Sequence, residues 1–382
     1  MTPPRPFSLV TAGVVTEILD ADVAAAKDLV RAVYVQAAGG GIVNPPSLFL
    51  RPEDGRPERF IALPAALTEP SPAVGIKWIG SFPGNLDAGL PRASAVIVLN
   101  DPETGFPVAC LEGAVISATR TALSAVVGAE TVAGRRETGR LAVIGAGVIA
   151  RRTVAMLLAS GWRLGEVAVF DPRVDQAEVL VRELAEAGPE VGGGATVGGG
   201  NAGAVAGAGL GSTGGAGAGL GVAGRVVGSP GEAVAGADLV LIATTATTPW
   251  FDDPALIRPG VTVLHLSLRD ITADTMAACD HVVDDPAHAA REGTSLELAI
   301  RQAGLAPDAV RPIGALLSGA APPRDPGRSV IYSPFGLGSL DVALAHFVLE
   351  RARTRGLVIE VPEFFGLSAD APAAQSGGAI RV

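Results

Sequence analysis

The chain has 382 residues, 48% of them hydrophobic, and a formal net charge of −10, which allows two domains with a sizeable core. No uncharged apolar run approaches the roughly 20 residues that span a bilayer, and the N-terminus lacks signal-peptide features, so we expect a soluble, cytoplasmic protein with no membrane partner. The negative charge argues against nucleic acid as a partner. Two cysteines exclude a disulfide framework, and four histidines without an HxxxH spacing predict no metal site.

The first part of the chain mixes helix and strand signals. Residues 1–15 are interpreted as a frayed entry with a short strand, and helical spacing of apolar side chains predicts an amphipathic helix over 22–38, ended by three glycines. Short apolar runs between turn residues then predict an antiparallel set that includes a hairpin. These strands are 47–50, 59–63, 73–81, 95–100 and 108–111. A long helix over 112–129 is expected to cross into the next domain.

Residues 139–171 carry a complete local motif. An apolar strand runs into the turn GAGVIA at 145–150, then into a helical pattern, and a second apolar strand ends on Asp171. Strand, glycine turn, helix, strand and acid in this order are typical of a Rossmann dinucleotide-binding domain. Gly145 permits the tight turn, Gly147 lets the backbone approach a pyrophosphate, and the helix start offers unpaired N–H groups. The alternative is a structural turn without a ligand.

The acid at the end of the second strand bears on the choice of cofactor. Asp171 would accept hydrogen bonds from ribose hydroxyls and repel a 2′-phosphate, which favours NAD. Arg173 lies close enough to leave NADP as the less favoured alternative. Four further residues are predicted to contact the cofactor from the turn or from a strand end: Val148, Ile149, Thr244 and Thr245.

The remainder of the chain continues the sheet and then returns. A helix over 174–187 precedes the segment 188–224, which holds 17 glycines in 37 residues and is interpreted as a disordered insertion without chemistry. Further strands are predicted at 237–245, 261–266 and 281–284, with the last of these ending the sheet, and a helix at 295–303. Residues 329–332, the loop 333–338 and the helix 339–355 are expected to fold back onto the N-terminal part. The predicted domains are 1–130 with 321–366, the inserted Rossmann domain 131–320, and a flexible tail 367–382.

One acidic residue follows a predicted strand of the Rossmann domain. Asp270 comes after the strand 261–266, at the edge where ligands bind in open α/β sheets. A carboxylate there can act as general base or orient a water. The alternative is a helix N-cap for the residues that follow.

Several cations lie in apolar or glycine- and proline-rich surroundings. They are Lys77, Arg92, Arg120 and Arg51. Lysine is rare among the 29 basic residues, which draws attention to Lys77. Together the cations suit a substrate with several carboxylates. The alternative is local pairing with surface acids, which for Arg51 is favoured by the neighbouring Glu53 and Asp54.

The motifs together resemble the ornithine cyclodeaminase/mu-crystallin family. They are GIKW at 75–78, LNDPETG at 99–105, SATRTA at 117–122, the IGAG turn and SPFGLGSLD at 333–341. The resemblance implies an α/β protein in which a Rossmann NAD(P)-binding domain is inserted in an α+β substrate and dimerisation domain. It also implies a homodimer that oxidises, reduces or deaminates amino or imino acids.

A second set of motifs is similar to a narrower branch, the dehydrogenases of 2,3-diaminopropionate biosynthesis. These motifs are KWIGSFPGN at 77–85, GLPRAS at 89–94, CLEG at 110–113 and SLRD at 267–270. The branch implies NAD-dependent oxidation of N-(2-amino-2-carboxyethyl)-L-glutamate to 2-oxoglutarate and L-2,3-diaminopropionate, by hydride transfer and imine hydrolysis. A PLP-dependent synthase would act upstream, in a siderophore or peptide-antibiotic pathway. The alternatives are an ornithine cyclodeaminase, a ketimine or amino-acid dehydrogenase, and a mu-crystallin-like binder of small ligands.

The resemblance also assigns roles to single residues. Lys77 corresponds to the lysine that holds the substrate carboxylate, Arg120 to the arginine near substrate and nicotinamide, and Asp270 to the catalytic aspartate. Three more residues are expected to touch the cofactor: Ser94, Ser333 and Gly336. The sequence departs from the cyclodeaminase pattern at Val148-Ile149, at Arg92, where many members have threonine, and at SLRDIT. These departures argue against ring closure of ornithine to proline.

Overall fold

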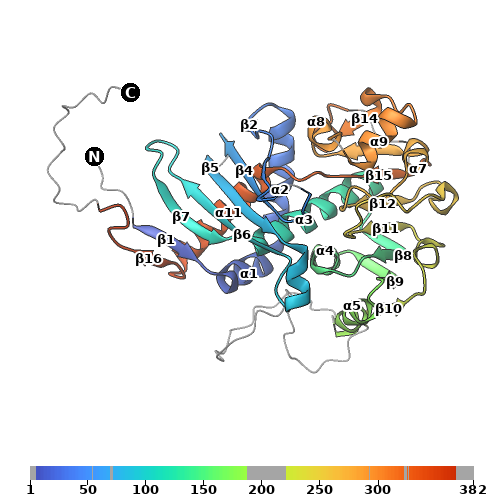
Figure 1. Cartoon of the computed structure of the whole chain (residues 1–382), viewed down its shortest axis with the longest axis horizontal. Coiled ribbons are helices and arrows are strands. Elements are labelled where there is room, and N and C mark those ends of the chain that lie inside the picture. Colours follow the sequence, from blue (N-terminus) through green and yellow to red (C-terminus); the bar gives the residue numbers. More distant parts are fainter. Residues whose placement is uncertain are drawn as a thin grey trace.

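The computed structural model describes residues 6–53, 55–68, 72–186, 221–291, 293–321, 325 and 327–366. They build two eight-stranded sheets with their helices (Figure 1). Within these ranges no helix is long and apolar enough to cross a membrane. Most of the predicted glycine-rich insertion, residues 188–220, and the predicted tail, 367–382, lie outside the described residues.

The first sheet carries the N-terminal strands and is mostly antiparallel. Its order is β16-β1-β7-β6-β5-β4-β2, with β3 paired to β4 beside this path. The strands are β1 Phe7–Val10, β2 Ile42–Val43, β3 Leu48–Leu50, β4 Arg59–Leu67, β5 Ala73–Ser81, β6 Ala93–Asn100, β7 Pro107–Glu112 and β16 Ile359–Val361. The β3–β4 hairpin and the antiparallel set β4 to β7 confirm the sequence prediction.

Helices lie on one side of this sheet. They are α1 Ala12–Ala21, α2 Val23–Ala38, α3 Ala114–Ala133 and α11 Gly338–Thr354. Alternate side chains of the strands face them, so that Ile97 and Leu99 are buried while Val96, which precedes Ile97, is 41% exposed. The prediction of a frayed entry over 1–15 is wrong beyond the strand β1, because α1 begins at Ala12 and buries apolar side chains at helical spacing.

The second sheet is parallel throughout its described pairs. Its order is β10-β9-β8-β11-β12-β15-β13-β14. The strands are β8 Glu137–Ile144, β9 Arg163–Phe170, β10 Ala223–Val226, β11 Leu239–Ile242, β12 Thr262–His265, β13 Asp280–Val283, β14 Val310–Pro312 and β15 Val330–Tyr332. Its central strands are buried apolar runs, as expected for a parallel sheet covered on both faces.

Shorter elements connect the strands of the second sheet. The α-helices are α4 Val148–Ala159, α5 Val174–Glu186, α6 Pro230–Val234, α7 Ala273–Ala277, α8 Pro286–Ala289, α9 Ser295–Gln302 and α10 Ile313–Leu317. The 3₁₀ turns are η1 Pro83–Ala88 in the first sheet's loops, and η2 Pro254–Leu256 and η3 Pro307–Ala309 in the second's.

Three sequence predictions about this sheet need correction. The strand at 329–332 does not fold back onto the N-terminal part, because β15 inserts between β12 and β13. The domain boundary at 320 is therefore too early, and the strand at 281–284 does not end the sheet, since β14 and β15 follow it in the chain. The insertion also ends sooner than 224, because β10 begins at Ala223 and pairs with β9.

The helix α3 joins the two halves of the molecule. It packs on β6 of the first sheet and on α4, β12 and β15 of the second (Figure 1). A side chain at Gly128 of α3 would overlap the ring of Tyr332 on β15, so glycine permits this close approach. The chain returns through α11, which packs against β4, β5 and β6. The prediction that the long helix crosses between domains is thus confirmed.

Candidate active site

The glycine turn has the shape that a dinucleotide requires. Gly145 has φ +86°, and a side chain there would overlap the backbone of Ala243 after β11. At Gly147, the N-cap of α4, an added Cβ would meet no atom within 4 Å, and no side chain caps the helix. Ala150 is fully buried between helix and sheet. Open space thus lies in front of the uncapped N-terminus of α4, where a pyrophosphate would bind.

The acid at the end of β9 faces this turn. The carboxylate of Asp171 accepts hydrogen bonds from the backbone N–H of Ala146 at 2.8 Å and of Arg173 at 2.9 Å. It therefore lies beside the glycine turn, as the sequence predicted for the residue that reads the ribose. Val148, at the start of α4, is 47% exposed, and the Arg173 side chain is exposed.

The predicted catalytic carboxylate is fully buried at the carboxyl edge of the second sheet. One oxygen of Asp270 accepts hydrogen bonds from the Thr244 hydroxyl and from Trp250 Nε1 at 2.9 Å. The other accepts from the Ser267 hydroxyl and lies 3.1 Å from Nε2 of His265. The N-cap alternative is wrong, because Thr272 is the N-cap of the following helix α7.

These contacts determine the charge of Asp270. Burial by itself raises the pKa of the carboxyl, but the hydrogen bond and attraction from His265, with the hydrogen bonds from Ser267 and Thr244, lower it to about 2. The side chain is therefore a carboxylate at neutral pH. A group with so low a pKa accepts protons weakly and is better suited to orienting a water or stabilising a nearby cation than to storing a proton.

A second buried charge cluster lies in the first sheet. Lys77 on β5 donates to Asp341 of α11 at 2.7 Å and to the hydroxyl of Ser117 of α3 at 3.0 Å. Arg120, one turn further along α3, contacts the other oxygen of Asp341 at 3.3 Å. Lys77 is 2% exposed and Asp341 is not exposed. One carboxylate thus holds two cations side by side, which leaves the cluster with a net positive charge.

Burial dominates the titration of the lysine. Burial lowers the pKa of Lys77, Asp341 opposes this and Arg120 adds to it, and the resulting pKa is about 8. The amine is therefore mostly protonated at neutral pH and titrates just above it.

The segment after β15 links the two charged groups. Ser333 lies 3.4 Å from Nδ1 of His265, whose other nitrogen contacts Asp270. Three residues on, Gly336 has φ +99°, and a side chain there would overlap the guanidinium of Arg120. The backbone N–H of Gly336 donates to the buried carboxylate of Asp284 at 2.6 Å, which anchors the turn. The loop 333–336 thus forms part of the site rather than a plain connection.

The remaining predicted residues divide into two groups. Thr244 contacts Asp270 as described, and Thr245 beside it is exposed at the same strand end. Ser94 on β6 pairs with Gly80 on β5. Its side chain faces away from the helix-covered side of the sheet, which carries Lys77. The structure therefore separates Ser94 from the rest of the predicted site, since side chains alternate along a strand.

The predicted arginines outside the cluster lie near the end of the first sheet. Arg51 is exposed and stacks over Phe49, with 5.4 Å from its guanidinium carbon to the ring centre. The expected pairing with Glu53 is not observed, because Glu53 pairs with Arg56. Asp54 lies outside the described residues. Arg92 is half-buried just before β6.

Sequence reasoning missed the partners of the predicted residues. Asp341 is the shared counter-ion of the two cations, and His265, Ser267 and Trp250 surround Asp270. A signal was present in two cases. Asp341 is an acid within the apolar first half of its helix, and His265 interrupts an apolar strand. Both patterns indicate a polar group that is buried for a reason.

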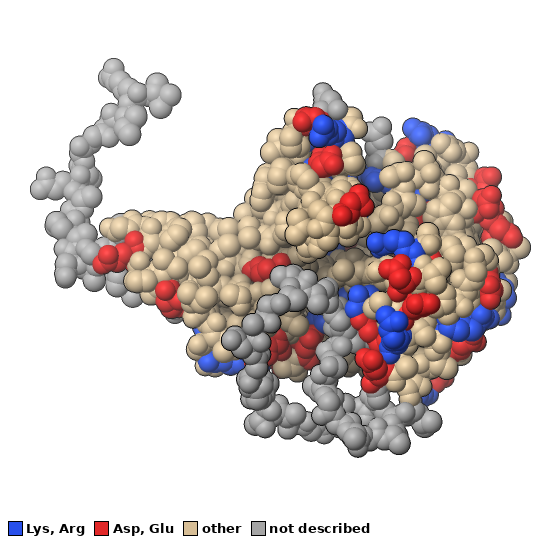
Figure 2. All heavy atoms as spheres, turned by 60° about the horizontal axis from the view of Figure 1, so that its bottom comes forward, with Lys and Arg blue, Asp and Glu red and all other residues tan. Residues whose placement is uncertain are grey.

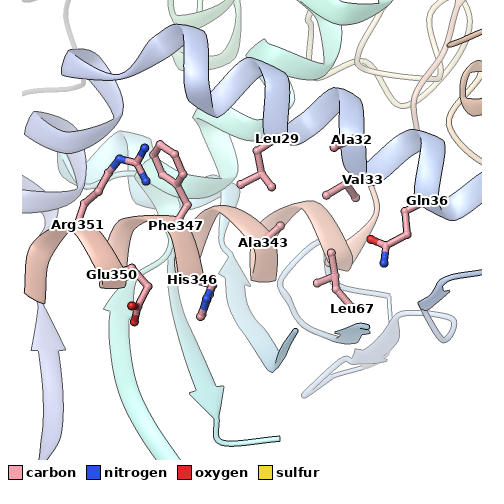
Figure 3. A pocket seen from close by; sticks show the side chains of 10 residues that line it. All are labelled: Leu29, Ala32, Val33, Gln36, Leu67, Ala343, His346, Phe347, Glu350 and Arg351. Atoms are coloured by element: carbon pink, nitrogen blue, oxygen red, sulfur yellow. The ribbon is translucent and has the colours of Figure 1, made fainter. Parts of the chain in front are cut away.

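A separate pocket lies on the far side of the helix layer. It opens between α2 and α11 and is lined mainly by apolar side chains such as Leu29, Val33 and Phe347, with Arg351 stacked on Phe347 (Figure 3). It contains none of the predicted site residues.

These features define a Rossmann dinucleotide-binding protein with a mixed α+β partner domain. The sequence matches the ornithine cyclodeaminase/mu-crystallin family over residues 9–208 and 216–356. The chain belongs to this family. It is 26% identical over 340 residues to N-((2S)-2-amino-2-carboxyethyl)-L-glutamate dehydrogenase of Staphylococcus aureus. The aligned residues cover 85% of this chain and 91% of that protein.

Solved structures share the whole architecture. The Δ1-pyrroline-2-carboxylate reductase of Thermococcus litoralis, in complex with NADH and L-proline, has a TM-score of 0.78 at 22% identity and covers 93% of this chain and 100% of its own. An archaeal alanine dehydrogenase dimer with bound NAD has a TM-score of 0.77 at 22% identity, covering 94% and 99%. These likenesses confirm the predicted fold class.

Proposed function

We propose that the protein is an NAD-dependent oxidoreductase acting on the CH–NH bond of an amino acid, and that its substrate is N-(2-amino-2-carboxyethyl)-L-glutamate. The products would be 2-oxoglutarate and L-2,3-diaminopropionate. The observation that carries the proposal is the buried pair of Lys77 and Arg120 on one carboxylate, linked through loop 333–336 to the buried Asp270. The name of the Staphylococcus aureus relative supports this substrate.

The residues of the glycine turn fit a dinucleotide. The space beyond Gly147 and the uncapped N-terminus of α4 suit a pyrophosphate, and Asp171 suits the ribose hydroxyls of NAD. Bound NAD supplies a hydride acceptor. Val148, Ile149, Thr244, Thr245, Ser333 and Gly336 are proposed to complete this site. Bound NAD or NADH in the similar solved structures supports the choice of cofactor.

Lys77 and Arg120 are proposed to hold the carboxylate next to the reacting carbon. Their shared partner Asp341 fixes both cations before substrate arrives, so that little ordering is needed on binding. An arginine can bind a carboxylate through two N–H groups, while lysine acts as a compact point charge. Orientation of the reacting carbon by such contacts contributes much of the rate in reactions of this kind.

Asp270 is proposed to act in the hydrolysis of the imine left by oxidation. Its negative charge would stabilise a protonated imine and orient the attacking water. In this structure each of its oxygens already accepts hydrogen bonds, and two of the donors are the hydroxyls of Thr244 and Ser267. Contact with water therefore requires one hydroxyl to rotate away, and the Ser267 hydroxyl has a second acceptor, the carbonyl of Ile242 at 3.3 Å.

The direct test is an assay with NAD and the proposed substrate. An increase in NADH absorbance, with 2-oxoglutarate and diaminopropionate formed in equal amounts, supports the proposal. Proline and ammonia from ornithine would assign a cyclodeaminase instead. NADH formation with alanine or proline but not with the glutamate derivative would assign a different amino-acid dehydrogenase. Binding of these compounds without any NADH would indicate a ligand-binding protein.

We also propose that the protein is a homodimer and that a PLP-dependent synthase supplies its substrate. The side of the first sheet that faces away from the helices exposes large apolar side chains. Trp78 is 38% exposed, Val96 beside it is 41% exposed, and Phe60 stacks on Trp78. Figure 2 shows few charged side chains on the arm formed by this sheet, whereas charges gather over the second sheet. An apolar face of this kind suits a second copy of the chain.

A further inference from the structure

Three arginines lie at one end of the first sheet, on neighbouring strands. Arg59 begins β4 and pairs with Ser81, the last residue of β5. Arg51 directly follows β3, which pairs with β4, and Arg92 directly precedes β6, which pairs with β5. The register of the sheet therefore brings the three together, although they are spread over more than forty positions of the chain.

A fourth arginine approaches them from the other domain. Arg269 lies next to Asp270 at the carboxyl edge of the second sheet, and its Nε donates to the carbonyl of Gly293 at 3.0 Å. Burial lowers the pKa of Arg59, and the positive charges of Arg92, Arg269 and Arg51 lower it further. Four cations from both halves of the molecule thus lie within electrostatic reach of one another.

None of the four arginines forms an ion pair with a carboxylate in the described part of the chain. The Nε atom of Arg92 is buried without any hydrogen-bond acceptor. Arg59 has one side-chain hydrogen bond, to the carbonyl of Pro57 at 3.3 Å. The chain has a net charge of −10, yet within the described residues no acid pairs with this group. Like charges without counter-ions repel one another, and a buried donor without an acceptor costs free energy. An anionic ligand would relieve both.

Arg59 lies on the same side of the sheet as the proposed carboxylate site. Lys77 pairs with Leu63 of β4, and Arg59 is four residues before Leu63, so both side chains point to the helix-covered face. The backbones of Arg59 and Lys77 are separated along the strands by about 13 Å, at roughly 3.3 Å per residue. Long cationic side chains extending from these two positions can hold opposite ends of one small molecule.

We propose that Arg51, Arg59, Arg92 and Arg269 form a second anionic subsite, which binds the remote carboxylates of a substrate whose first carboxylate is held at Lys77 and Arg120. The ligand class is an amino or keto acid with two or more carboxylates. The subsite rests on the proposed function for the identity of the substrate. Because Arg269 belongs to the second sheet and the others to the first, an occupied subsite also ties the two domains together.

Binding of two ligands of equal chain length can be compared to distinguish the second subsite from the first. 2-Oxoglutarate has a remote carboxylate, and 2-oxopentanoate lacks it. We expect the wild-type protein with NADH to bind 2-oxoglutarate at least ~10-fold more tightly, because a charged hydrogen bond of this kind is worth about that much. In Arg59→Gln and Arg269→Gln this preference should fall severalfold or more, while binding of 2-oxopentanoate stays unchanged. Arg182→Gln, which removes an exposed arginine of α5 without an ion pair among the described residues, is the control for a simple loss of charge.

The outcomes distinguish the subsite from the proposed reaction. If the glutamate derivative is not oxidised but the preference for 2-oxoglutarate exists and depends on Arg59 and Arg269, the proposed substrate is wrong and the subsite stands. If the derivative is oxidised and its KM is the same in Arg59→Gln, Arg269→Gln and Arg182→Gln, the subsite is wrong. Arg269 is exposed, so Arg269→Gln tests the proposal even if Arg59→Gln fails to fold.

Discussion

At the scale of single residues, the site is a set of buried charges whose neighbours set their protonation. Lys77 and Asp270 show the two opposite cases. Burial dominates at Lys77 and brings its pKa to about 8, whereas at Asp270 the surrounding donors outweigh burial and bring the pKa to about 2. Near neutral pH both groups are mainly charged, so the site presents a cation to a substrate carboxylate and an anion to a developing cation.

The titration of Lys77 predicts how activity depends on pH. Only the protonated amine attracts a carboxylate, so kcat/KM should fall as pH rises through about 8 and the amine is lost. Below that pH the lysine is cationic and should impose no further change. Rates measured between pH 6 and 10 at subsaturating substrate provide the test. Lys77→Met should be slow at every pH and lack the inflection near 8, so an unchanged inflection in this variant would assign it to another group.

Removal of the charge of Asp270 should affect chemistry more than folding. Asp270→Asn keeps the shape of the side chain but replaces one accepting oxygen by an N–H donor. That donor would face a neighbouring donor, which should destabilise the protein by roughly 1–3 kcal/mol. We expect kcat to fall by about 10²–10⁴-fold. Steady-state rates measure the loss of kcat, and near-ultraviolet circular dichroism of the same sample shows whether the variant is folded. Near-normal turnover in a folded variant would remove Asp270 from the mechanism. Asp252→Asn, at an exposed acid nearby, is the matched control.

At the scale of elements, turns place the charged side chains. Loop 333–336 follows β15 of the second sheet and leads into α11 of the first, so it is the point where the chain passes the site. Gly336 lets the backbone lie directly against Arg120 and anchors on Asp284. The position of a substrate-binding arginine thus depends on a backbone conformation that favours glycine.

Gly336→Ala should therefore weaken substrate binding as well as stability. The residue has φ +99°, which costs roughly 1–2 kcal/mol for a residue with a side chain, and the new methyl group would displace Arg120. We expect a severalfold or larger increase in KM together with a lower urea midpoint. Gly356→Ala has a similar backbone requirement, φ +67°, but no atom within 4 Å of the added methyl group. It should lose stability alone, and an equal change of KM in both variants would contradict this account.

Several elements could be predicted from local pattern alone. The strand β5 has the bounds that the sequence predicted, 73–81, and the helix α2 begins one residue later than predicted. The α1 helix was not predicted, although its apolar side chains have regular helical spacing. Residues 329–332 were expected to fold back onto the N-terminal part, whereas they form β15 of the second sheet, since three apolar residues carry no information about which neighbour they pair with.

At the scale of the whole molecule, the two sheets divide the work. The second sheet carries the glycine turn, Asp171 and Asp270, and the first carries Lys77, with Arg120 on the helix that joins them. The proposed arginine subsite again draws on both halves. A substrate that contacts both domains at once would favour the arrangement in which they are close, which is how a ligand stabilises one conformation over another.

The apolar side of the first sheet predicts the state of assembly. Trp78→Glu places a charge in the middle of the exposed face, and we expect it to shift a wild-type dimer toward monomer by tenfold or more in dissociation constant, since an unpaired charge in an interface is costly. Light scattering over a range of concentrations provides the measurement. Val174→Glu changes an exposed apolar residue on α5 instead and should leave the dimer intact. A monomeric wild-type protein at micromolar concentration would contradict the proposal.

The sequence by itself determined the features that depend on neighbours along the chain. These are the Rossmann turn with its acid, the antiparallel strands, the importance of Lys77 and Asp270, and the family, because motifs and periodicity extend over only a few residues. The tertiary structure alone decided which groups meet. Lys77 and Asp341 are 264 positions apart, and the four arginines lie in or next to separate segments of both sheets. Strand order and register place such residues together, and these are set by packing of the whole core rather than by any local pattern.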